Sequence, residues 1–133
     1  MSNSSISIMI PTYNRYDRLI RLLKYYESYN NSFKIIICDS SSDTLEDYDD
    51  FKKHLKSYNI DYYTFDHSTP CYKKIFKSLD YIKTKYVLLC ADDDFISPKG
   101  IIKSEEFLEQ NTDYTAALGK TISYIFHNNE IKC

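Results

Sequence analysis

The chain contains few of the residues that break or cross-link a fold. Its 133 residues include only two Gly and three Pro, which excludes collagen-like and linker-rich chains. Its four cysteines form no Cys-x-x-Cys pair, so neither a zinc site nor a dithiol site is indicated. Cys38 and Cys90 stand inside apolar runs, as small buried hydrophobes do. These features favour reduced thiols in a cytoplasmic protein.

Long apolar runs and an excess of positive charge are also absent. No apolar run approaches the roughly 18 residues of a membrane span, and the first residues do not resemble a secretory signal. We therefore expect no transmembrane segment and a cytoplasmic location, with attachment at a membrane surface left open. Seventeen basic and nineteen acidic residues give a net charge of −2. That balance argues against a nucleic-acid partner, because phosphate binding normally requires a basic surface.

What the sequence does contain is a globular balance, with 43% hydrophobic and 27% charged residues. The length predicts a single domain over residues 1–133. Short apolar runs rich in β-branched residues alternate with amphipathic segments of helical period. Strands are predicted at 6–10, 33–38, 60–65, 86–90, 114–118 and 121–126, and helices follow the first four of them, the last at 97–110. This alternation predicts an α/β fold with a mostly parallel sheet and helices on both faces.

Polar residues follow the predicted strands, where parallel α/β sheets bind their ligands. Residues 11–14 follow the first strand, Asp39 follows the second, and residues 92–94 follow the fourth. Alone, Asp39 is also explained as the cap of a turn, and Tyr13 as a packing ring. The residues gain significance together, because the fold brings them to one edge of the sheet.

The Asp92–Asp94 triplet is the strongest chemical signal. Adjacent carboxylates repel one another unless a cation or solvent screens them. Hard oxygen ligands on a strand-end loop suit Mg²⁺ or Mn²⁺. The competing interpretation is a solvated acidic turn that caps the helix after Ser97.

Three segments resemble motifs of the family 2 glycosyltransferases, which have the GT-A fold. They are IMIPTYNR at 8–15, IIICDSSSD at 35–43 and YVLLCADDDFISP at 86–98. The segments occur in the family's order and are spread over most of residues 5–100. The resemblance implies a GT-A-like, Rossmann-like domain that ends after the Asp-x-Asp region and supplies the donor-binding part of a transferase.

The resemblance also implies roles for individual residues in binding a nucleoside-diphosphate sugar, with a UDP-sugar favoured. Pro11, Thr12 and Tyr13 match the loop around the base and ribose, and Asp39 matches the nucleobase ligand. Asp92 is expected near the ribose or the metal. Counting back from Pro98 makes Asp93 the favoured ligand of Mn²⁺ or Mg²⁺, with Asp94 a second candidate. Lys73 or Lys74 could reach the diphosphate, but a solvated helix face is the favoured expectation for both.

The resemblance further implies a metal-dependent, inverting glycosyltransferase of the hexosyltransferase type, acting on a glycan or another hydroxyl acceptor. The general base and the acceptor-binding half are expected beyond residue 133. Without that half, we expect exposed apolar side chains at Tyr114, Tyr124, Ile125 and Phe126. Such a surface predicts self-association, as a homo-oligomer, or marginal solubility.

The sequence leaves two other functions open. A non-catalytic nucleotide-binding or partner-binding module would keep the fold without the chemistry. A receiver-like phosphoacceptor domain has similar length and alternation, but it requires acidic residues after the first strand, where this chain has Pro11–Asn14.

Overall fold

The computed structural model describes residues 5–29, 33–43, 45, 48–57, 59–127 and 130–132. Its contacts divide the chain into two compact units, Met1–Pro98 and Lys99–Cys133, and each is described by itself. The expectation that residues 1–133 fold as one domain stays a prediction. Among the described residues, no helix is long and apolar enough to cross a membrane.

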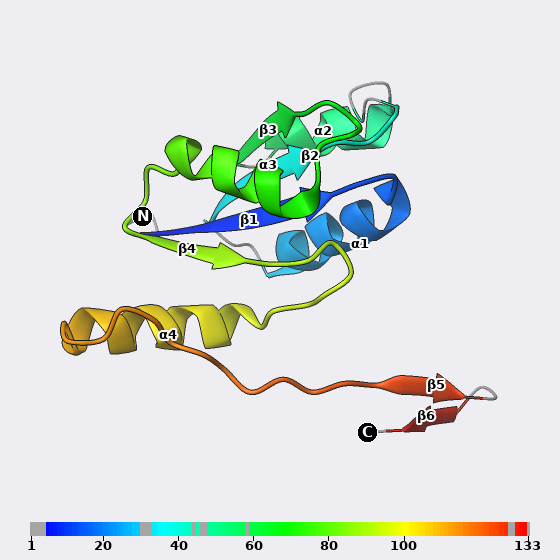
Figure 1. Cartoon of the computed structure of the whole chain (residues 1–133). Helices are drawn as coiled ribbons and strands as arrows, with labels where there is room; N and C mark the ends of the chain where they lie inside the picture. The colour runs from blue at the N-terminus through cyan, green and yellow to red at the C-terminus, as the bar shows by residue number, and fades with distance from the viewer. Residues whose placement is uncertain are drawn as a thin grey trace. The chain divides into compact units, whose positions relative to one another are not determined.

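The first unit is built on a four-stranded parallel sheet. Its strands are β1 (Ile6–Thr12), β2 (Lys34–Asp39), β3 (Ile60–Thr64) and β4 (Tyr86–Leu89), in the spatial order β3-β2-β1-β4 (Figure 1). This order confirms the predicted α/β sheet. A receiver domain places its second strand at the edge of the sheet, whereas β2 here lies between β3 and β1.

The registers place the strand ends side by side. Thr12 pairs with Asp39 on β2, and Asp39 pairs with Thr64 on β3. On the other side of β1, Met9 pairs with Leu89, so that β4 ends next to the middle of β1. The residues that follow β4 can therefore turn back along the last part of β1.

Helices cover both faces of this sheet. Met9, Ile36 and Cys38 form a buried cluster against Ile75 and Ile82, which lie on and after α3 (Cys71–Ser78). The 3₁₀ turn η2 (Leu79–Tyr81) follows α3. The opposite face contacts α1 (Tyr16–Ser28) and α2 (Asp49–Ser57) (Figure 1). Apolar residues four and seven apart on α1 are fully buried, as its helical period predicts: Leu19, Leu22, Leu23 and Tyr26.

The second unit contains α4 (Pro98–Gln110) and a two-stranded antiparallel sheet of β5 (Ile125–His127) and β6 (Glu130–Lys132). The helix agrees with the sequence-based prediction for 97–110. The prediction of a strand at 114–118 was wrong, because residues 111–124 have no regular secondary structure. The predicted strand at 121–126 is formed only from Ile125 onward. The apolar residues of 114–124 alternate, but among the described residues no strand pairs with this segment. An extended segment without a partner strand does not form a sheet.

Candidate functional site

The ends of β1 and β4 are joined by a buried hydrogen bond. Thr12 Oγ1 donates to Asp92 Oδ2 at 2.8 Å, although the two residues are 80 positions apart. Thr12 is 3% exposed and Asp92 is 4% exposed. The carboxylate of Asp92 is therefore held in one orientation at the carboxyl edge of the sheet.

Asp39, at the end of β2, is surrounded by donors from its own chain. Its Oδ1 accepts hydrogen bonds from the backbone N–H and the hydroxyl of Ser41, at 2.8 and 2.5 Å. Its Oδ2 accepts from the Tyr62 hydroxyl of β3 at 2.7 Å. The side chain is only 2% exposed. Both carboxylate oxygens are thus fixed by the protein.

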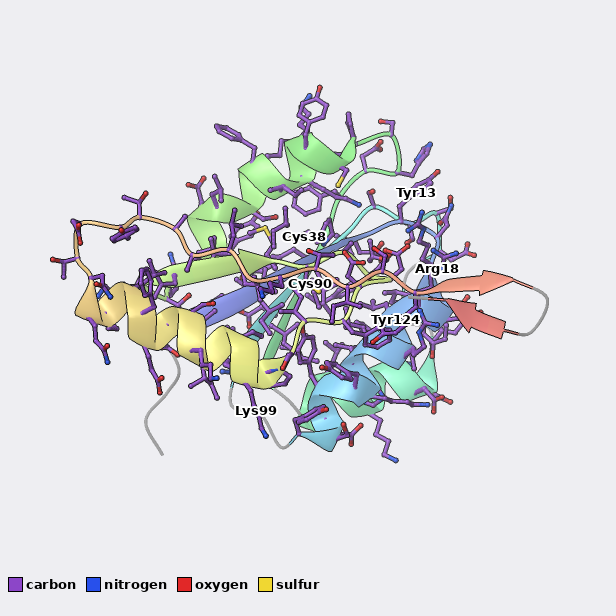
Figure 2. All side chains as sticks on the ribbon, turned by 90° about the horizontal axis from the view of Figure 1, so that it is seen from below. Tyr13, Arg18, Cys38, Cys90, Lys99 and Tyr124 are labelled. Carbon is purple, nitrogen blue, oxygen red and sulfur yellow. The ribbon has the colours of Figure 1, made fainter. Side chains whose placement is uncertain are left out.

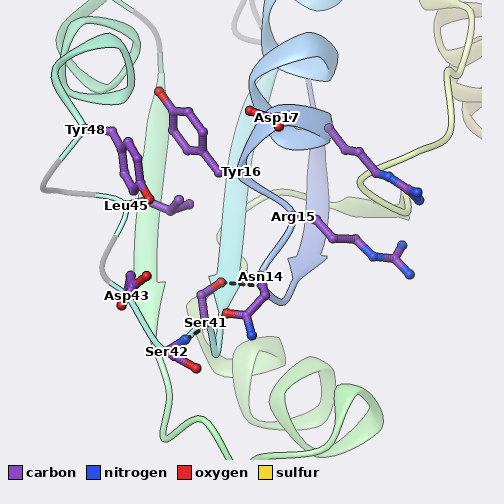
Figure 3. A pocket seen from close by; sticks show the side chains of 10 residues that line it. Asn14, Arg15, Tyr16, Asp17, Ser41, Ser42, Asp43, Leu45 and Tyr48 are labelled. Atoms are coloured by element: carbon purple, nitrogen blue, oxygen red, sulfur yellow. Dashed lines mark hydrogen bonds between the residues drawn. The ribbon is translucent and has the colours of Figure 1, made fainter.

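Asn14 ties the loop after β1 to the loop after β2. Its backbone N–H donates to Ser41 Oγ at 2.8 Å, and its side-chain oxygen accepts from the Ser42 N–H at 2.9 Å (Figure 3). Its φ of 51° lies in the left-handed region, which Asn tolerates better than most residues. The N-cap position of α1 is Arg15, so Asn14 lies one residue before the helix cap.

The burial of Lys74 contradicts the sequence-based prediction for this residue. We expected a solvated helix face, but the side chain is 2% exposed. Its Nζ donates to Ser40 Oγ at 2.8 Å and also to the carbonyl oxygen of Thr12. Burial lowers the pKa of Lys74, while the negative charges of Asp39 and Asp92 oppose that shift. A cation therefore lies beneath both buried carboxylates.

Two arginines of the β1–α1 segment face the Asp triplet. Arg15 Nη1 lies 3.1 Å from Asp92 Oδ1 and 3.2 Å from Asp93 Oδ2. Arg18 Nη1 lies 2.8 Å from the same Asp93 oxygen. Figure 2 shows Arg18 and Tyr13 at the same end of the first unit. Tyr13 is 48% exposed, so its ring is available to cover a ligand.

A pocket of about 790 Å³ lies beside this edge (Figure 3). It is bounded by the N-terminal part of α1 and the segment after β2, and the rings of Tyr16 and Tyr48 stack at its wall with centroids 4.1 Å apart. Asn14, Ser41 and Ser42 line the pocket, but none of the predicted donor-binding residues does. The candidate site therefore consists of the hydrogen-bonded strand ends, and the pocket lies next to it.

Beneath the Asp triplet lies the thiol of Cys90, which is 1% exposed. It accepts a hydrogen bond from the Tyr26 hydroxyl at 3.8 Å. Burial, aided by the negative charges of the triplet, raises the pKa of Cys90 to about 11. The thiol is neutral at physiological pH and adds no charge to the site.

The structure thus brings Thr12, Asp39 and Asp92 to one buried edge, with Asp93 more exposed beside them. Pro11 is half-buried, and Asp94 is exposed. Sequence reasoning missed the roles of four other residues, which are Tyr62, Lys74, Arg15 and Arg18. Only the two arginines left a signal in the sequence, because Arg18 follows Arg15 by about one helical turn.

Comparisons with known proteins agree with this fold. The family model for glycosyl transferase family 2 matches residues 7–132. Two crystal structures of S. aureus TarS, one of them of residues 1–349, are similar to the chain at 20% identity, with TM-scores of 0.67 and 0.68. They cover 79% and 80% of this chain. No curated protein sequence matches it.

The fold is that of a GT-A-like α/β domain, as predicted. The chain belongs to glycosyl transferase family 2. It spans 19% of the TarS chain and 33% of the shorter TarS structure. The likeness to TarS therefore concerns the fold of this part.

Proposed function

We propose that the chain binds a nucleoside-diphosphate sugar, a UDP-sugar by preference, as the donor part of a glycosyltransferase. The observation that carries the proposal is the convergence of Thr12, Asp39 and Asp92 at the carboxyl edge of a parallel sheet in a member of this family. Ligands of open α/β sheets bind at this edge.

Asp39 suits recognition of a nucleobase imide. A carboxylate has about four acceptor positions, and the hydrogen bonds from Ser41 and Tyr62 use three of them. Within the described part of the chain, one position remains, which suits the N–H of a uracil base. We propose that the exposed ring of Tyr13 covers the face of that base, with Pro11 and Thr12 shaping the loop around the ribose.

The chemistry of the Asp triplet fits a divalent cation. Among the described residues, no three His, Cys, Asp or Glu side chains converge as a metal site. Mg²⁺, however, is held by one or two carboxylates together with substrate phosphates, and Asp93 and Asp94 offer such oxygens. We propose that they hold Mn²⁺ or Mg²⁺ and that Asp92 contacts the ribose. When bound, the cation neutralises charge on the departing diphosphate.

The proposed reaction is attack of an acceptor hydroxyl, from a glycan or another alcohol, on the anomeric carbon with inversion. Family membership supports a hexosyltransferase of this kind. We propose that the general base lies outside residues 1–133. Glu105, His127 and Glu130 could act as bases by their chemistry, but none stands in a sequence context that resembles the general base of the family. The alternative is a module that binds nucleotide without transferring sugar.

Calorimetric titration tests the proposal. UDP, GDP and several UDP-sugars are titrated into the chain with and without Mn²⁺. We expect UDP and UDP-sugars to bind, more tightly with Mn²⁺, and GDP to bind less tightly. A flat response to every nucleotide would contradict the proposed function. Binding without turnover in the presence of any acceptor would favour the non-catalytic alternative.

A further inference from the structure

The Asp triplet is already partly neutralised by the protein. Three ion pairs link it to Arg15 and Arg18, across 75 to 78 positions of the chain. Two guanidinium groups therefore oppose three carboxylates. A divalent cation supplies the same two positive charges, so the arginines occupy the electrostatic role that a metal would take.

The two partners in these ion pairs differ in their freedom to move. Asp92 is 4% exposed and is also held by Thr12. The arginine side chains are 49% and 50% exposed, and Asp93 is 38% exposed. Exposed ion pairs are weak, at about 0.2–1 kcal/mol, so the guanidinium groups can leave without moving the buried carboxylate.

The geometry makes arginine and metal compete for one atom. Both Arg15 and Arg18 direct an Nη1 to Asp93 Oδ2. A cation bound through this oxygen would place two further positive charges beside both guanidinium groups. Coulomb repulsion at such short range would drive the arginines away from the carboxylate.

The displaced arginines have a natural partner in the proposed ligand. A guanidinium group matches a phosphate through two parallel hydrogen bonds, which an ammonium cannot provide. Arg15, at the N-cap of α1, and Arg18, in its first turn, both lie next to Asp93, which is proposed to hold the metal. A donor diphosphate bound there lies within reach of both side chains.

We propose that Arg15 and Arg18 are exchangeable counter-ions of the donor site. They neutralise Asp92 and Asp93 in the nucleotide-free chain, release them when the metal binds, and then bind the diphosphate of the donor. This inference rests on the proposed function and extends it, because it assigns two diphosphate-binding residues and a linkage between metal and nucleotide.

Arg21 provides a matched control. It lies one further turn along α1, and its guanidinium carbon lies 5.2 Å from the centroid of the Phe95 ring. No ion pair to the Asp triplet is formed by Arg21 within the described part of the chain. Replacing it removes the same charge from the same helix without touching the carboxylates.

The test measures two affinities in the full chain. Binding of Mn²⁺ alone is followed by the paramagnetic resonance signal of the free ion, and binding of UDP is measured by calorimetry at saturating Mn²⁺. In Arg18→Gln, Mn²⁺ should bind about two- to fivefold more tightly, because an exposed competing ion pair is lost. UDP should bind at least about fivefold more weakly, because a charged hydrogen bond to phosphate is lost. Arg21→Gln should change neither affinity.

Arg18→Lys separates charge from geometry. It should keep the Mn²⁺ affinity of the original chain, because the positive charge remains, but bind UDP more weakly, because the planar fork is gone. Circular dichroism checks that each variant is folded, and Arg15→Gln serves as a second variant with the same expected signs.

Tighter binding of Mn²⁺ together with weaker binding of UDP in the same variant is the signature of the exchange. Unchanged or weaker Mn²⁺ binding in Arg18→Gln and Arg15→Gln would overturn it, as would unchanged UDP binding or the absence of Mn²⁺ binding in every variant. If the original chain binds no UDP at saturating Mn²⁺, the proposed function has failed instead, which keeps the two failures distinguishable.

Discussion

Lys74 and Ser40 are joined by a buried hydrogen bond of 2.8 Å between the Lys74 ammonium and the Ser40 hydroxyl. The same ammonium donates to the carbonyl oxygen of Thr12, so one side chain of α3 fastens the ends of β1 and β2. These two strand ends position Thr12 and Asp39. The relationship makes Lys74 a positioning residue, which acts through the groups proposed to contact the donor.

Lys74→Met should therefore weaken UDP binding by about 5- to 30-fold, because two buried acceptors lose their donor. The free energy of unfolding should change less, because the variant also removes the cost of burying an ammonium group. Calorimetry and urea denaturation measure the two effects. Lys73→Met is the control, since Lys73 is exposed on the same helix. Equal UDP affinity in both variants would show that Lys74 positions nothing.

Asp39→Asn should weaken UDP binding by about 1–3 kcal/mol, because an amide cannot accept at both oxygens. Tyr62→Phe should weaken it less, by about 0.5–1.5 kcal/mol, through loss of the hydrogen bond from the Tyr62 hydroxyl to Asp39 Oδ2. Tyr63→Phe is the control, because that ring stacks on Tyr81 and lies on the opposite face of the sheet. Unchanged UDP affinity in a folded Asp39→Asn chain would leave Asp39 as the cap of its turn.

Asp93→Ala should abolish the dependence of UDP-sugar binding on Mn²⁺ or Mg²⁺, and Asp94→Ala should reduce it. The expectation follows from the spacing to Pro98 and from the carboxylate pair at the end of β4. Asp80→Ala, an exposed acidic residue on the 3₁₀ turn, is the control. If metal dependence survives in Asp93→Ala and is lost in Asp94→Ala, the assignment is displaced by one residue.

The raised pKa of Cys90 predicts that the folded chain loses stability at alkaline pH. Its pKa is raised from 9.0 to about 11 in the folded chain, so the unfolded state loses this proton first. The folded state then holds more protons than the unfolded state, and the free energy of unfolding falls as pH rises through this window. Below pH 9 the contribution is fully present.

Urea denaturation at several pH values from 8 to 11 measures this effect for the original chain and for Cys90→Ala. The decline should be shallower in Cys90→Ala, with a difference on the order of 1–3 kcal/mol. Comparing the two slopes cancels the shared contributions of Lys74, whose lowered pKa acts with the opposite sign, and of the tyrosines. Parallel slopes would contradict the raised pKa of Cys90.

Exposed apolar side chains of the second unit predict self-association. Tyr114 and Tyr124 are exposed, as expected from the sequence, and so are Leu118 and Ile122. The side chains of Ile125 and Phe126, also named in that expectation, lie outside the described residues. Sedimentation at several concentrations should show association that Leu118→Ser with Ile122→Ser reduces. A monomer at every concentration would contradict the prediction.

The sequence by itself determined the parallel α/β sheet and the polar residues at its strand ends. Buried strands appear as short runs such as 35–38, and helices as apolar spacings such as those of Leu19 and Leu22, because burial imposes a local period on the chain. The family motifs at 8–15, 35–43 and 86–98 could also be recognised from the sequence, because each is a continuous segment of the chain.

Only the tertiary structure decided how those strand ends are held. Lys74 is indistinguishable from Lys73 by spacing, and its burial depends on where α3 lies against β1 and β2. The contacts of Asp39 with Tyr62 and of Asp93 with Arg18 join residues 23 and 75 positions apart. Hydrogen bonds and ion pairs between distant segments leave no period in the sequence, because they depend on the packing of whole elements rather than on neighbours along the chain.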